Sequence, residues 1–77
     1  MNDFQQTPAQ DTAVEGLREH GPMTAAGLAR YLMAERGVTR NAGYEVVARA
    51  LRRGRIARRK APYDVSPIYY LPDDSAQ

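Results

Sequence analysis

Apolar residues recur at intervals of three and four positions in three stretches of the chain, residues 8–20, 25–36 and 40–53. This spacing places them on one side of a helix, so each stretch is expected to bury that side and expose the other. The apolar positions are Ala9, Ala13, Val14 and Leu17, then Leu28, Ala29, Leu32 and Met33, then Gly43, Val46, Val47, Ala50 and Leu51. The pattern predicts three amphipathic helices.

Residues that start and stop helices bracket each stretch. Thr24 and Thr39 precede the second and third helices as N-caps, and Gly37 and Gly54 end them. The first helix begins with Thr7 as N-cap and Pro8 in the first position, or one turn later at a second capping box headed by Thr12. Gly21-Pro22 ends it. Gly16, inside that helix, is expected to permit close packing of a neighbouring helix.

The periodicity changes after Gly54. Residues 55–60, with Ile56 pointing inward, and residues 68–71 are predicted strands, and the turn-rich segment 61–67 between them makes a hairpin. The expected core consists of Leu17, Leu28, Leu32, Val47, Leu51 and Ile56.

Length and composition narrow the class of protein. The 77 residues suffice for one small domain, with 43% hydrophobic and 26% charged residues. We expect residues 1–7 to be flexible, residues 8–71 to fold and residues 72–77 to form a disordered acidic tail. No apolar run reaches the roughly 18 residues of a membrane span. With no cysteine and one histidine, His20, the composition argues against an enzyme, a metal or another cofactor, and it favours the cytoplasm.

Basic residues are concentrated in the third helix and the hairpin. Residues 40–60 contain eight basic residues and one acidic residue, a net charge of +7, whereas the rest of the chain carries three basic and eight acidic residues, a net charge of −5. A field of this kind attracts polyanions, although an arginine-rich solvated face would have the same composition. Charge alone does not choose between them.

The order of these elements resembles the winged helix-turn-helix family of DNA-binding domains. The segment from Met23 to Leu32 is similar to the family's second helix, and Gly37-Val38-Thr39-Arg40-Asn41 is similar to its turn into the recognition helix. Val47, Leu51, Gly54 and Ile56 occupy matching core, stop and wing positions. The resemblance covers residues 8–71. It implies an α+β fold that is mostly α: a three-helix bundle with a helix-turn-helix, followed by a two-stranded hairpin wing.

The resemblance implies a small double-stranded DNA-binding protein, a transcriptional regulator of bacterial or phage type. The third helix would enter the major groove, where arginine suits guanine edges and asparagine suits adenine edges. The wing would follow the phosphate backbone or reach the minor groove, unless its charges only protect a strand edge. The candidate DNA-binding residues are Arg40, Asn41, Tyr44, Glu45, Arg49, Arg52, Arg58, Arg59 and Lys60.

Three assignments within this set remain open. Arg40 and Asn41 either read bases or only occupy an exposed first turn. Tyr44 either contacts phosphate and sugar or covers the edge of the core. Glu45 either accepts a hydrogen bond from cytosine or, because Arg49 lies four residues later, forms a surface ion pair.

An alternative function is a protein-interaction module on the same fold, such as a small phage-type protein that binds host transcription or defence machinery. Glu45 and the net charge of only +2 favour it, whereas the +7 segment favours DNA. A two-fold symmetric DNA site would favour a weak homodimer. No membrane partner or small-molecule ligand is indicated.

Overall fold

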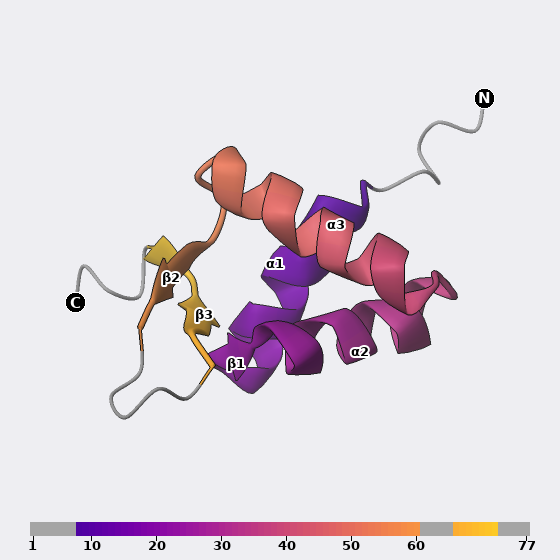
Figure 1. Ribbon diagram of the computed structural model, residues 1–77, viewed down its shortest axis with the longest axis horizontal. Coiled ribbons are helices and arrows are strands. Elements are labelled where there is room, and N and C mark those ends of the chain that lie inside the picture. The colour runs from indigo at the N-terminus through magenta and orange to yellow at the C-terminus, as the bar shows by residue number, and fades with distance from the viewer. Residues whose placement is uncertain (1–7, 61–65, 73–77) are drawn as a thin grey trace.

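The computed structural model describes residues 8–60 and 66–72. Helices and strands follow in the order α1 (Ala9–His20), β1 (Met23–Thr24), α2 (Ala25–Arg36), α3 (Arg40–Arg52), β2 (Ala57–Arg59) and β3 (Ile68–Tyr70) (Figure 1). The three predicted helices are confirmed to within one residue at each end. Residues 1–7, 61–65 and 73–77 lie outside the described residues.

Threonine side chains start the second and third helices as predicted. The Thr24 hydroxyl accepts a hydrogen bond from the Gly27 N–H at 3.1 Å, and the Thr39 hydroxyl accepts one from the Ala42 N–H at 3.1 Å. Both predicted starts of α1 are wrong: Pro8 is the N-cap and not the first helical residue, so α1 begins one residue later than the first of them and one turn earlier than the capping box at Thr12. Thr12 instead accepts a hydrogen bond at 3.4 Å from the Arg36 guanidinium of α2.

The strands form a small antiparallel sheet in the order β1-β3-β2. The predicted hairpin of β2 and β3 is confirmed, with Arg58 opposite Tyr69 and Arg59 opposite Ile68. The short strand β1, which pairs Met23 with Tyr69, was not predicted. A strand of two residues is too short to show the alternation of apolar and polar positions that predicts a strand. In addition, the sequence assigns Thr24 as the N-cap of α2.

The end of α3 shortens the first wing strand relative to the predicted range 55–60. The Arg55 N–H donates to the Ala50 carbonyl at 2.9 Å, and the Gly54 N–H donates to the Leu51 carbonyl at 3.0 Å. Gly54 has a φ of 76°, so these bonds form a Schellman motif that a residue with a Cβ would strain. Arg55 then forms an ion pair with Asp11 of α1 at 2.5 Å, which holds the start of the wing against the bundle.

The core lies between the three helices and the inner face of the sheet. Five of the six predicted core residues, namely Leu17, Leu28, Leu32, Val47 and Ile56, are buried. The expectation for Leu51 is wrong: this side chain is only half-buried, and Ala50 is fully buried instead. Successive residues of a helix are about 100° apart, so a buried face centred on Gly43, Val47 and Ala50 leaves Leu51 on its flank.

Two glycines permit close contacts between helices. A Cβ added to Gly16 would lie 2.7 Å from Cδ2 of Tyr31, which confirms that α2 packs closely there. A Cβ on Gly43 would lie 3.2 Å from the Ala29 carbonyl oxygen and 3.3 Å from the Ala29 Cβ, so α3 crosses α2 at this point. Three helices followed by an antiparallel hairpin form a winged helix, with the sheet at the opposite end of the bundle from the α2–α3 turn (Figure 1).

Candidate nucleic-acid interface

The side of α3 that faces away from the core is exposed and carries most of the predicted binding residues. It is defined by Asn41, Glu45, Ala48, Arg49 and Arg52, all of them exposed, and is called the outer arc below. These residues are exposed because Gly43, Val47 and Ala50 occupy the opposite side of the helix. The helix α3 therefore presents an exposed and mostly polar side, and the major groove of DNA is wide enough to admit an α-helix.

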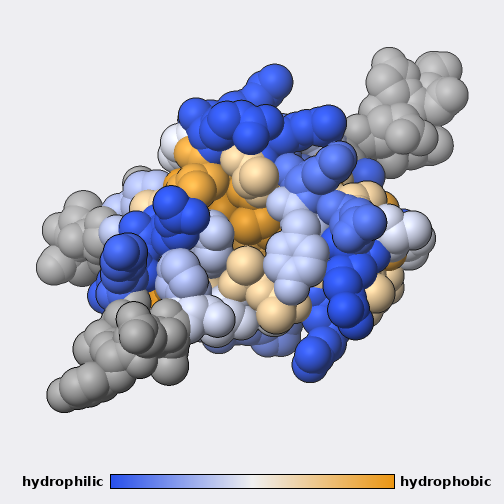
Figure 2. Space-filling model, viewed as in Figure 1, coloured by the Kyte–Doolittle hydropathy of each residue, from blue (hydrophilic) through white to orange (hydrophobic). Residues whose placement is uncertain are grey.

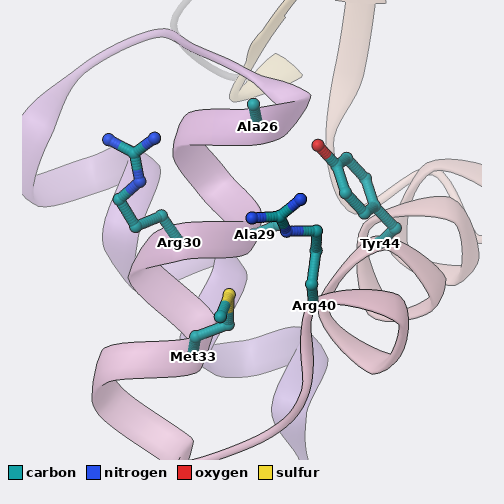
Figure 3. Close-up of a pocket in the computed structure, with 6 residues that line it drawn as sticks. All are labelled: Ala26, Ala29, Arg30, Met33, Arg40 and Tyr44. Atoms are coloured by element: carbon teal, nitrogen blue, oxygen red, sulfur yellow. The ribbon is translucent and has the colours of Figure 1, made fainter.

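Arg40 and Tyr44 lie on a flank of α3, beside α2. Together with α2 they line a hollow of about 230 Å³, whose lining residues are Ala26, Ala29, Arg30, Met33, Arg40 and Tyr44. In Figure 3 the Arg40 side chain extends along α2 toward Ala29, and the Tyr44 ring stands one turn further along α3 with its hydroxyl on the same side. Tyr44 is 39% exposed, so it does not simply cover the core.

Arg30 is a residue of this hollow that the sequence did not single out. It lies on α2 and is exposed, with its side chain extending from the rim of the hollow (Figure 3). The sequence signal for it was weak, because Arg30 stands alone among apolar residues and outside the basic segment 40–60. Only the crossing of α2 over α3 brings it near Arg40.

Glu45 is exposed at the centre of the outer arc. The ion pair with Arg49 that the four-residue spacing predicted is not formed: within residues 8–60 and 66–72, carboxylates lie near basic side chains at Asp11–Arg55, an ion pair, and at Glu19–His20, where Nε2 is 3.6 Å from the carboxylate. Long exposed side chains gain little from such pairing and lose conformational freedom in it. Neither Arg49 nor Arg52 is therefore neutralised by a carboxylate of the described chain.

The basic residues of the wing, Arg58, Arg59 and Lys60, are all exposed. Because side chains alternate along a strand, Arg58 lies on the sheet face of its partner Tyr69, and Arg59 lies on the other face with Tyr70. The Arg59 guanidinium carbon lies 5.5 Å from the centre of the Tyr70 ring, a cation–π contact. Arg58 forms no such contact with an aromatic ring of the described residues, so the two adjacent arginines differ in what holds their side chains.

Hydrophilic side chains gather over α3 and over the wing strands, and apolar surface, orange to tan, lies between them (Figure 2). Hydrophilic surface over α3 and hydrophilic surface over the wing strands are thus both visible on this face of the molecule (Figure 2). Within the described residues, no carboxylate pairs with any arginine of the outer arc, the hollow or the wing strands.

One solved structure is similar to this chain over almost its whole length. The crystal structure of transcriptional regulator PA4135 superposes with a TM-score of 0.68 and 30% sequence identity, and the match covers 99% of this chain. The chain resembles a transcriptional regulator in fold and in sequence. It spans 54%, about half, of the length of that regulator's chain.

The other comparisons give no match. No family model matches the sequence, and neither does any curated protein. Within residues 8–60 and 66–72, no helix is both long and apolar enough to cross a membrane.

Proposed function

We propose that this chain is a DNA-binding domain acting in transcriptional regulation, with α3 in the major groove and the wing along the backbone. The observation that carries the proposal is the outer arc of α3: its arginines are exposed and unpaired with any carboxylate of the described chain, on a winged-helix frame. The similarity to a transcriptional regulator supports it. The domain acts by binding and not by catalysis.

The residues divide into two roles under this proposal. Asn41, in the first exposed turn of α3, reads adenine through its amide. Arg49 and Arg52 on the outer arc, and Arg58 and Lys60 on the wing, contact phosphates, which position the domain without reading sequence.

The test is a fluorescence anisotropy titration of labelled duplexes at about 50 and 200 mM salt, after selection of a preferred site from a random pool. Replacing Arg52 by glutamine should weaken all duplexes equally and lower the salt slope by about one. Replacing Asn41 by alanine should cost about 1–3 kcal/mol on the preferred site and much less on random DNA.

Arg18, exposed on α1, supplies the matched control, because Arg18→Gln removes the same charge outside the proposed interface. If Arg18→Gln weakens DNA binding as much as Arg52→Gln does, the loss of affinity comes from the change in net charge and not from a contact made by Arg52. No binding of wild-type protein to any duplex at micromolar concentration and the lower salt would refute the proposal.

Glu45 supports a second candidate, a protein-interaction module, because its exposed carboxylate at the centre of the arc pairs with no cation of residues 8–60 or 66–72 and suits a partner that carries cations. The Glu45→Gln variant separates the possibilities by sign. Removal of a merely repulsive anion raises non-specific DNA affinity, whereas loss of an acceptor for cytosine N4 lowers affinity for the preferred site. If DNA affinity is absent and Glu45→Gln weakens a protein complex, the second candidate stands.

A further inference from the structure

We propose that the hollow between α2 and α3 binds one sugar–phosphate unit of the DNA backbone, with Arg40 and Tyr44 as fixed donors and Arg30 as an arm that closes over the phosphate. The inference rests on the proposed function and deepens it. It gives Arg40 a phosphate-binding role in place of base reading, and it adds Arg30 to the interface.

The charge of the hollow fits an anion. Two of its six lining residues are arginines and none is acidic. Neither Arg30 nor Arg40 forms an ion pair with a carboxylate of residues 8–60 or 66–72. Arginine binds phosphate through two parallel N–H donors, and the Tyr44 hydroxyl supplies a second kind of donor on the same side as Arg40 (Figure 3).

The shape of the hollow fits the sugar that accompanies the phosphate. Its floor consists of two alanines and a methionine, namely Ala26, Ala29 and Met33. Small side chains let a ligand approach the α2 backbone, and their apolar surface can pack against a deoxyribose. A free inorganic anion would leave this floor uncovered, so a nucleic-acid backbone fits the lining better.

The three donors come from both helices, Arg30 from α2 and Arg40 and Tyr44 from α3, so a single phosphate in the hollow would contact both. Arg40 is the first residue of α3, whose N-terminus also favours negative charge. Arg30 is exposed, and its guanidinium is turned outward in Figure 3, so a rotamer change brings it toward a bound phosphate within nanoseconds. A phosphate held in this way would fix the angle at which the outer arc meets the bases.

The experiment measures duplex affinity of the full chain between about 50 and 200 mM salt for Arg30→Gln, Arg40→Gln and the double variant. Loss of one phosphate contact lowers the salt slope by about 0.9, so the advantage of wild type over the variant shrinks by about 3.5-fold across that fourfold range. Because both arginines hold the same phosphate, the double variant should lose no more slope than one contact. Arg18→Gln is the control, and it should leave the salt slope of the wild-type protein unchanged.

Two further arms make the test specific. Ala26→Leu fills the exposed edge of the hollow without changing charge, and leucine is nearly as good a helix former as alanine, so it should weaken binding with the fold intact. A set of duplexes, each with one neutral methylphosphonate linkage, should contain a linkage that weakens wild-type binding but has no effect on the double variant.

The possible results separate this inference from the proposed function. If wild type binds DNA but Arg30→Gln behaves like Arg18→Gln, the hollow is not a phosphate site, and the proposed function stands. If Arg40→Gln weakens only the preferred sequence, Arg40 reads a base, and the inference is overturned. A slope loss of about 1.8 in the double variant would mean two separate phosphates and would also overturn it. Failure of wild type to bind any duplex refutes both proposals.

Discussion

The close contact between Gly16 and the Tyr31 ring predicts that Gly16→Ala destabilises the wild-type protein but stabilises the Tyr31→Ala variant, which lacks the ring. A Cβ on Gly16 would lie 2.7 Å from Cδ2 and 2.8 Å from Cε2 of Tyr31. Carbon atoms in van der Waals contact lie about 3.5–4.0 Å apart, so the ring must move by about 1 Å. The ring is half-buried between α1 and α2 and also meets the His20 ring edge-to-face, at 5.4 Å between centroids, so the movement disrupts packing.

The magnitude follows from two opposing terms. Overpacking of a closely fitted site costs about 1–3 kcal/mol, whereas replacing glycine by alanine inside a helix contributes about 1 kcal/mol in favour of folding. We therefore expect Gly16→Ala to destabilise the wild-type protein by about 0–2 kcal/mol. In the Tyr31→Ala background the steric term is absent, and Gly16→Ala should stabilise the fold by about 1 kcal/mol.

Urea unfolding followed by circular dichroism measures both effects, because a domain of this size is expected to unfold in one cooperative step. With a slope near 1 kcal/mol per molar urea, a change of 1 kcal/mol shifts the midpoint by about 1 M. Gly27→Ala is the control: its Cβ would lie 3.4 Å from the Thr24 hydroxyl oxygen and 3.7 Å from the Met23 Cβ, ordinary contacts, so it should not destabilise either background. Equal stabilisation by Gly16→Ala in both backgrounds would refute the reasoning.

Two other predictions concern stability. Leu32→Ala, at a fully buried side chain, should cost about 2–5 kcal/mol by urea unfolding, and Leu51→Ala, at a half-buried one, clearly less; an equal cost would contradict the observed direction of α3. The pKa of Tyr31 is raised above its ordinary value of 10.0 by partial burial and by nearby carboxylates on α1 and α2 (Glu35, Glu19 and Glu15). The folded state therefore holds the phenolic proton more tightly, and stability should fall as pH rises above 10.0, by less in Tyr31→Phe than in wild type.

Local signals predicted the helices well because each signal corresponds to one hydrogen bond or one conformational requirement. Thr24 and Thr39 each accept the expected backbone N–H, and Gly54 adopts the positive φ that ends α3. Periodicity fixed the buried side of α3 only to within about one residue, or 100° of rotation. That uncertainty is the reason why Leu51 was placed in the core, a position that the smaller Ala50 occupies.

Features that depend on the packing of distant segments could not be predicted in this way. The strand β1 exists because Met23 meets Tyr69, which lies far along the chain. The opposite faces of Arg58 and Arg59 follow from the register of β2 with β3. Arg30 joins the candidate interface only through the crossing of two helices. Charge and composition identified the basic segment, but the register and the crossing decide which of its side chains can act together.

The crossing itself depends on a residue that has no side chain. Gly43 lets α3 approach the backbone of α2 at Ala29, and Ala29 also forms part of the floor of the hollow between the two helices. The width of the hollow is therefore determined by the same contact that joins the helix-turn-helix. Arg30 and Arg40 project from the two helices on either side of this contact. A glycine that reads from the sequence as an apolar position of an amphipathic helix thus positions two arginines, one of them outside the basic segment, at a single site.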